Sequence, residues 1–227
     1  MPKTYLICIS KKFLTEGYQI PIQYNLFENE VEGEAETYIK PNYEESYFGF
    51  DQYLCHHDFK HKKKGKVFQK NFSYFFEPAD FNLYYNPETS LTLIGIKTDI
   101  ALDFINELNK TEYYDISTIK INFEKMIPQF VEIGGAWFAD LKKAHLNSAA
   151  LFGSHVNKSE EYKEAAKEGN ISSLNIKYIS RADANEYTVM ITNKGSIVLY
   201  DKVETIKEEL ELVLDIYEHL IKPHENT

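Results

Sequence analysis

The chain has 227 residues, of which 43% are hydrophobic and 26% charged, and its formal net charge is −10 at pH 7. This length predicts one large domain or two small ones, and the composition excludes a chain that is disordered throughout. An acidic chain repels nucleic acid and anionic membranes on average, so binding to either requires a local basic patch. Arg181 is the only arginine, which argues against sequence-specific reading of duplex DNA, because lysine cannot make the bidentate contacts of arginine to guanine.

The N-terminal segment 1–13 contains only a short apolar stretch at 5–9. It lacks the hydrophobic core and the cleavage site of a signal peptide, and no run in the chain approaches the 18 apolar residues of a membrane span. Cys8 and Cys55 fit neither a disulfide framework nor a paired-cysteine metal motif. We therefore expect a soluble, cytoplasmic protein without a membrane partner, in which Cys8 is a reduced core residue.

The first half of the chain, residues 1–133, is predicted to be dominated by β-structure and is rich in aromatic residues. Alternating and β-branched residues predict strands over 4–10, 18–27, 91–96 and 116–123, with several short strands between 38 and 85. A helical stripe predicts a helix over 99–109 with Thr98 or Asp99 as its N-cap.

A row of alternating glutamates occupies residues 28–36: Glu28, Glu30, Glu32, Glu34 and Glu36. In a strand these carboxylates would line one face. Gly33, and the absence of any large apolar residue but Val31 opposite them, favour a solvated loop or an exposed hairpin instead. The row suggests one hypothesis, an acidic mimic of a phosphate backbone that occupies the nucleic-acid groove of a basic protein partner.

The second half, residues 134–227, is predicted to be α+β. Helices are expected over 136–151, where Trp137, Leu141, Ala144 and Leu151 have helical spacing, over 158–168 after a capping box at Asn157, and over 204–221. Strands are expected near 171–179, 186–192 and 196–201, the last two joined by a hairpin with Gly195 in the left-handed region.

The predicted fold class is therefore α+β, with largely antiparallel sheet and a long C-terminal amphipathic helix packed on a three-stranded C-terminal sheet. No linker rich in glycine, proline or serine separates the halves, so one continuous domain is the alternative to two. Leu212 and Ile216 widen the apolar stripe of the last helix, and this extra width suits a homo-oligomer as well as a core.

A cluster of histidines stands at residues 51–61, and four of its side chains are candidate ligands of a divalent metal: His56, His57, Asp58 and His61. His57 and His61 lie four residues apart and would share one face of a helix, which imitates the spacing of a zinc hydrolase motif with aspartate in place of glutamate. The neighbouring lysines would repel a cation. A polar loop with titrating histidines is the alternative.

A basic strip follows at once, with lysines as candidate phosphate contacts and flanking aromatic rings as candidate stacking partners of bases: Lys60, Lys62, Lys63, Lys64, Lys66, Phe59 and Phe68. Further aromatic residues lie at 72–76. Lysines beside stackable rings suit single-stranded nucleic acid. A lysine-rich hairpin tip whose rings belong to the core is the alternative.

No nucleotide-binding glycine loop, calcium-binding loop or serine-nucleophile motif occurs in the sequence. We therefore expect a non-enzymatic binding or accessory protein that acts through a protein partner or single-stranded nucleic acid and needs no cofactor. A metal-dependent hydrolase or nuclease built on the histidine cluster is the second hypothesis, and the phosphate mimic is the third. Composition alone suggests a phage, mobile-element or immunity origin.

Overall fold

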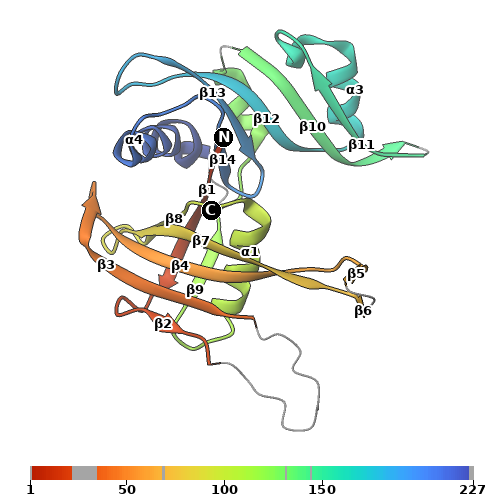
Figure 1. The fold of residues 1–227 in the computed structure, drawn as a ribbon. Coiled ribbons are helices and arrows are strands. Elements are labelled where there is room, and N and C mark those ends of the chain that lie inside the picture. Colours follow the sequence, from red (N-terminus) through yellow and green to blue (C-terminus); the bar gives the residue numbers. More distant parts are fainter. Residues whose placement is uncertain (1, 22–34, 68–69, 131, 144, 225–227) are drawn as a thin grey trace. The chain divides into compact units, whose positions relative to one another are not determined.

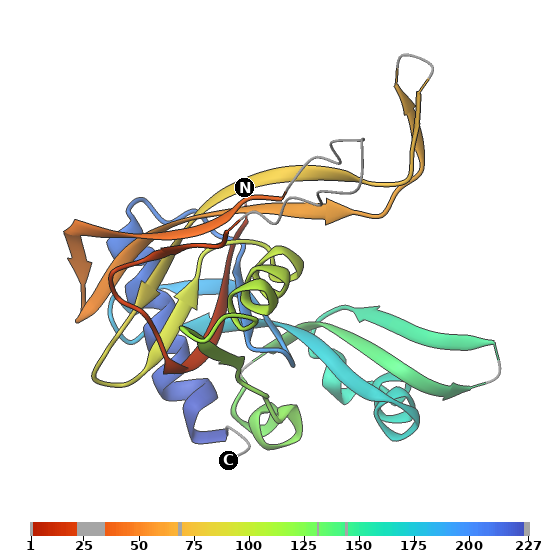
Figure 2. The same cartoon turned by 90° about the horizontal axis from the view of Figure 1, so that it is seen from below.

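The structure is a computed structural model that describes residues 2–21, 35–67, 70–130, 132–143 and 145–224 (Figures 1 and 2). The chain forms two compact units. Unit 1 comprises Met1–Ile7 and Thr118–Thr227, and unit 2 comprises Cys8–Ser117. The first strand therefore begins in unit 1 and ends in unit 2. The predicted division between residues 133 and 134 stays a prediction.

In its described residues, unit 2 contains strands of the main sheet, a separate two-stranded sheet of β5 and β6, and one helix. Its strands are β1 (Lys3–Lys12), β2 (Tyr18–Gln19), β3 (Thr37–Tyr47), β4 (Phe50–His61), β5 (Gly65–Val67), β6 (Lys70–Phe72), β7 (Phe75–Tyr85), β8 (Leu91–Ile94) and β9 (Asp115–Thr118), and its helix is α1 (Thr98–Leu108). The strand order β1-β8-β7-β4-β3-β2 places β4 between two long neighbours, and both pair with it antiparallel.

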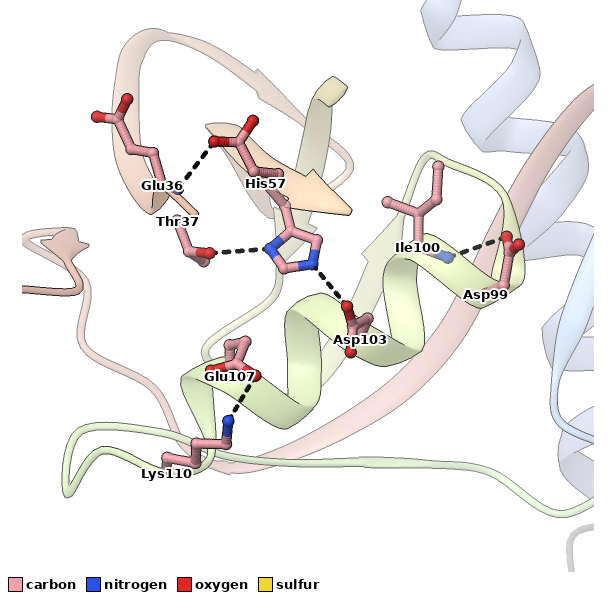
Figure 3. A network of polar contacts seen from close by, with 9 residues as sticks. Glu36, Thr37, His57, Asp99, Ile100, Asp103, Glu107 and Lys110 are labelled. Carbon is pink, nitrogen blue, oxygen red and sulfur yellow. Dashed lines mark hydrogen bonds and ion pairs between the residues drawn. The ribbon is translucent and has the colours of Figure 1, made fainter. Parts of the chain in front are cut away.

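Helix α1 packs on this sheet through the apolar stripe that the sequence predicts, so the expected helix over 99–109 is confirmed to within one residue. Its Phe104 ring meets the Phe81 ring of β7 edge-on at 5.0 Å. The predicted N-cap is wrong, because Lys97 occupies that position without a side-chain hydrogen bond. Asp99 instead accepts the Ile100 N–H at 3.0 Å, one residue along (Figure 3).

Within its described residues, unit 1 combines strands with three helices and four short helical turns. Its further strands are β10 (Glu132–Lys143), β11 (Leu146–Phe152), β12 (Asn170–Ile179), β13 (Glu186–Thr192) and β14 (Ser196–Leu199). The helices are α2 (Phe123–Met126), α3 (Glu160–Glu168) and α4 (Ile206–Ile216), and the turns are η1 (Ile127–Gln129), η2 (Val156–Lys158), η3 (Tyr217–Ile221) and η4 (Lys222–His224). None of the helices in the described ranges is long and apolar enough to cross a membrane.

The predicted α+β class with largely antiparallel strands is confirmed. The predicted three-stranded C-terminal sheet is wrong, because β12, β13 and β14 are neighbours within a longer hydrogen-bonded order, β11-β10-β12-β13-β14-β1, that continues to twelve strands in the described part of the chain. The polar residues between 157 and 170 do form a helix, α3, but Ser159 rather than Asn157 is its N-cap.

The helix predicted over 136–151 is the main error, since β10 and β11 form an antiparallel hairpin there. The helical spacing of Trp137 and Leu141 is coincidental. Ala136 and Phe138 are buried while Trp137 between them is half-buried, which is the two-residue period of a strand. Pairing with β12 on the other side of β10 stabilises this conformation. Ala144 lies outside the described residues.

Two predicted strands in the first half are shorter than expected. The strand expected over 116–123 ends at Thr118, because Asn122 caps α2 by accepting the Glu124 N–H at 3.1 Å. Of the strand expected over 18–27, the structure shows Tyr18–Gln19 as β2, and residues 22–27 lie outside the described ranges.

The helix predicted over 204–221 corresponds to α4, which begins at Ile206, and to the turn η3 that follows it. A reciprocal capping box between Thr205 and Glu208 starts α4. Its polar side chains reach two strands of unit 1. The Tyr5 hydroxyl of β1 donates to Glu209 at 2.7 Å, and the Tyr178 hydroxyl of β12 donates to Asp215 at 2.8 Å. The residues that widen the stripe, Leu212 and Ile216, are already buried within the chain.

Both cysteines are buried side chains. Burial raises the pKa of the Cys8 thiol and of the Cys55 thiol above the ordinary value. Each thiol is therefore protonated at neutral pH and unreactive as a nucleophile.

The turn between β13 and β14 offers a test of the hairpin prediction, because Gly195 has φ +87° as expected. An added Cβ there would lie 2.6 Å from Cγ1 of Ile119, so Gly195→Ala combines a strained backbone with a clash. We expect it to lower the free energy of unfolding by about 1 to 3 kcal/mol, measured by urea denaturation. Gly134→Ala, whose Cβ would meet its nearest neighbour at 3.6 Å, is the control; equal losses in both variants would contradict this account.

Candidate nucleic-acid interface on a lysine-rich ribbon

The lysine cluster lies on a two-stranded ribbon in unit 2. The pairing of β3 with β4 stops at His57, whereas β4 and β7 stay paired as far as His61 and Phe75. Beyond that point β5 and β6 pair with each other, from Gly65 and Phe72 onward. We call residues 59–77 the ribbon. Figure 2 shows β4 and β7 continuing past the other strands of unit 2 into this hairpin.

The ribbon is strongly basic within an acidic chain. It contains six lysines and a single acidic residue, Glu77, so it carries +5 with neutral histidine, and the remainder of the chain carries −15. Lys62, Lys63, Lys64 and Lys66 are exposed. Among the described residues none of these four pairs with a carboxylate. Glu77 is itself hydrogen-bonded to His61 at 2.5 Å.

The rings of the ribbon pack against one another and against charged side chains. On one side, the Lys60 ammonium lies 3.7 Å from the centroid of the Tyr74 ring, which is a cation–π contact. On the other side, His61 stacks on Phe75 with centroids 4.8 Å apart, and Phe59 meets His61 edge-on.

Phe75 keeps 41% of its surface exposed, so it is the ring best placed to stack on a ligand. In the sequence it is one of the further aromatic residues at 72–76, and nothing there distinguishes it from its neighbours as a site residue. Phe68, which was predicted, lies outside the described residues, and Phe59 is half-buried.

His57 is a buried structural residue rather than part of the ribbon. It is 2% exposed, its Nδ1 lies 2.9 Å from the Thr37 hydroxyl of β3, and its Nε2 lies 3.2 Å from the Asp103 carboxylate of α1 (Figure 3). These contacts join two strands and a helix. Thr37 is also buried, at 4% exposure, whereas the Asp103 side chain is 40% exposed. The hydroxyl and the imidazole are therefore enclosed, the carboxylate reaches solvent, and the three together fix α1 to the sheet.

The helical spacing proposed for the metal ligands is wrong, because residues 50–61 form the strand β4. His57 and His61 lie on one face of the strand and about 13 Å apart at 3.3 Å per residue, while His56 and Asp58 lie on the other face. Throughout the ranges that the structure describes, no group of three or more histidine, cysteine, aspartate or glutamate side chains is arranged to hold a metal ion.

The partners of the histidines are carboxylates that sequence reasoning did not connect to them. Asp80, the partner of His56, is its direct cross-strand neighbour on β7. A prediction that the two aromatic-rich strands β4 and β7 pair antiparallel would have placed His56 opposite Asp80. Asp103 comes from α1, which no local pattern links to β4.

His56 lies in a partly exposed cluster on the outer face of β4. Its ring stacks on Tyr38 at 5.2 Å, and its nitrogens lie 2.7 Å from Asp80 and 3.4 Å from Asp58. Partial burial, the largest single influence, lowers the pKa of His56. The hydrogen bonds and charges of Asp80 and Asp58 together outweigh burial, so the pKa lies above its ordinary value of 6.5.

Of the glutamate row at residues 28–36, the structure describes only the last member, Glu36. Glu28, Glu30, Glu32 and Glu34 lie outside the described residues. Glu36 is half-buried, donates its N–H to Asp58 and accepts a hydrogen bond from Gln19 at 2.9 Å. Glu36 therefore takes part in the edge of the sheet, and the phosphate-mimic hypothesis stays a prediction.

The raised pKa of His56 gives a pH-dependent contribution to stability. Because the folded-state pKa exceeds the unfolded value, the contribution is complete below pH 6.5 and disappears as the pH rises through the folded-state pKa. Asp80→Asn should lower the His56 pKa in an NMR titration. The free energy of unfolding of Asp80→Asn should fall below that of the native protein by more near about pH 5.5 than near about pH 8.

Asp115→Asn, which alters an exposed aspartate of β9 in the same unit, is the control for Asp80→Asn. A His56 pKa that does not move in Asp80→Asn, or moves equally in Asp115→Asn, would refute the assignment of the shift to Asp80.

Comparison with known proteins adds no family to this description. A scan against models of protein families finds no match for the chain, and a search of curated proteins finds none either. The case for the ribbon therefore rests on its own residues: exposed lysines that pair with no carboxylate in the described ranges, and an exposed ring at the end of two paired strands.

Proposed function

We propose that the protein is a non-enzymatic accessory protein that binds single-stranded nucleic acid through the ribbon. The separation of charge carries this proposal: the ribbon holds +5 and the rest of the chain −15. Lysines that neutralise phosphates release counterions and so provide affinity without reading sequence. The acidic remainder repels the same ligand, which confines contact to the ribbon.

The rings of the ribbon favour single strands over duplex. Phe75 offers an exposed face beside the lysines, and stacking of aromatic rings needs bases that are not already paired and stacked. The ribbon also contains no arginine, the residue whose planar fork makes the commonest specific contact with guanine in a duplex groove. The proposed ligand is therefore single-stranded and recognised with little sequence preference.

The proposal assigns binding and no reaction to the ribbon. The exposed lysines and the Phe75 ring of the ribbon are groups that bind, and the Thr37 hydroxyl and the His57 imidazole of the nearby network are buried. An acidic protein partner could be attracted by the same lysines, so the experiment below includes an acidic polypeptide as a competing polyanion.

Charge reversal of the loop tests the role of the lysines. Lys62→Glu, Lys63→Glu and Lys64→Glu combined should abolish binding of a fluorescent oligothymidylate about twenty nucleotides long, measured by anisotropy. In the native protein, log affinity should fall with log salt at a slope of up to about −3.5 if five lysines contact phosphates. Polyglutamate should compete only weakly, because it has no bases to stack.

The matched control reverses three exposed lysines of unit 1, Lys194, Lys202 and Lys207. It changes the net charge by the same amount and should retain most of the affinity. Equal losses in the two triple variants, or binding that does not depend on salt, would refute the ribbon as the interface. Competition by polyglutamate as strong as that by the unlabelled oligonucleotide would replace nucleic acid with an acidic protein partner.

Removal of the exposed ring tests stacking separately from charge. Phe75→Ala should weaken binding of the oligonucleotide by about tenfold, because one stacked base is worth about 1 to 3 kcal/mol. The salt slope should not change, since no phosphate contact is lost. Phe152→Ala, which removes a ring that is 70% exposed on β11, is the control and should leave affinity unchanged; an unchanged affinity in Phe75→Ala would exclude stacking on this ring.

A further inference from the structure

A second candidate site lies in unit 2, away from the ribbon. It is a cavity of about 370 Å³ where the loop that follows β1 meets β3 and the beginning of β4. The pairing of β3 with β4 shifts register between Asn42 and Ser46, and this bulge forms one wall of the cavity. The volume is within the range of small-molecule sites.

The lining of the cavity is acidic and has no compensating cation. Glu16, Glu45 and Asp51 contribute carboxylates, and no lysine, arginine or histidine is among the lining residues. Glu16 accepts only a 3.3 Å hydrogen bond from its neighbour Thr15. In the described part of the chain, the Asp51 side chain makes no hydrogen bond or ion pair. The site therefore holds negative charge that no described side chain neutralises.

An unpartnered phenol lines the same cavity. Tyr53 is 2% exposed and its ring packs edge-on against Phe13 at 5.0 Å, but its hydroxyl has no hydrogen-bond partner among the described residues. Burial, and then the nearby charges of Asp51 and Glu16, raise the pKa of Tyr53, so the phenol stays neutral at physiological pH. Among the described residues, the one fully enclosed side-chain oxygen without a partner belongs to Tyr162, so the Tyr53 oxygen is not sealed off and a ligand in the cavity can hydrogen-bond to it.

We propose that this cavity binds a protonated primary amine. The carboxylates of Glu16 and Asp51 and the Tyr53 phenol are three acceptor groups, enough to receive the three N–H donors of an alkylammonium group. Tyr43 lines the cavity with 86% of its surface exposed and so offers a ring face for a cation–π contact. An uncharged polyol would satisfy the phenol but would leave the carboxylates uncompensated.

The ammonium group could come from a free diamine or from a lysine side chain of a protein, and the test separates these sources. Isothermal titration calorimetry on the full chain compares cadaverine with pentanediol, its uncharged analogue of the same chain length. A third titration uses the peptide acetyl-Gly-Lys-Gly-amide. We expect cadaverine to bind and pentanediol not to bind. Binding of the peptide as tight as that of cadaverine would identify a protein-borne lysine as the source, and weaker binding a free amine.

Variants locate the binding. Asp51→Asn, Glu16→Gln and Tyr53→Phe should each weaken cadaverine binding by about tenfold, as expected for loss of one hydrogen bond to a charged group. Glu88→Gln, which neutralises an exposed carboxylate of unit 2 outside the cavity, should have no effect. Asp51 and Glu16 are exposed side chains, so their variants should fold normally even if Tyr53→Phe does not.

Three results would overturn the proposal. The first is the absence of heat from cadaverine at millimolar concentrations, and the second is equal binding of pentanediol. The third is cadaverine binding that weakens as much in Glu88→Gln as in Asp51→Asn, which would indicate general attraction to an acidic chain. None of these bears on the ribbon, because oligonucleotide binding is measured separately.

Discussion

The antiparallel pairing of β4 with β7 is the constraint on which both candidate sites depend. Residues at the start of β4 belong to the acidic cavity, those in its middle form the core and the His57 network, and those at its end form the ribbon. Because side chains alternate between the faces of a strand, a register shift of one residue would expose His57 and bury His56 with its two carboxylates. The core therefore specifies where both sites lie.

The buried imidazole of His57 shows how polar and apolar contacts combine at that core. Its ring meets Phe104 of α1 edge-on at 6.0 Å, and both of its nitrogens have partners. An unsatisfied buried nitrogen would cost about 1 to 3 kcal/mol, so the network confers specificity on the docking of α1 as well as stability. A purely apolar contact would leave the helix less strictly positioned on the sheet.

Elements with a local signal were predictable and elements defined by pairing were not. Helix α4 was predictable from its continuous apolar stripe, whereas the spacing of Trp137 and Leu141 fits a helix only by chance, and pairing with the neighbouring strands makes this segment a strand. The lysine cluster was visible because its members are adjacent in sequence. The acidic cavity was not, since Glu16 of the loop after β1 comes close to Asp51 and Tyr53 of β4 only in the folded chain.

The chemical inertness of the two thiols has a practical consequence. Cys8 and Cys55 are the only cysteines in the sequence, and both are buried and protonated at neutral pH. A single cysteine introduced at an exposed position would therefore be the one site that reacts quickly with a maleimide label. The native chain can thus carry a spin label or a fluorophore at any chosen surface position without removal of its own cysteines, so distances within each unit become measurable on the unaltered core.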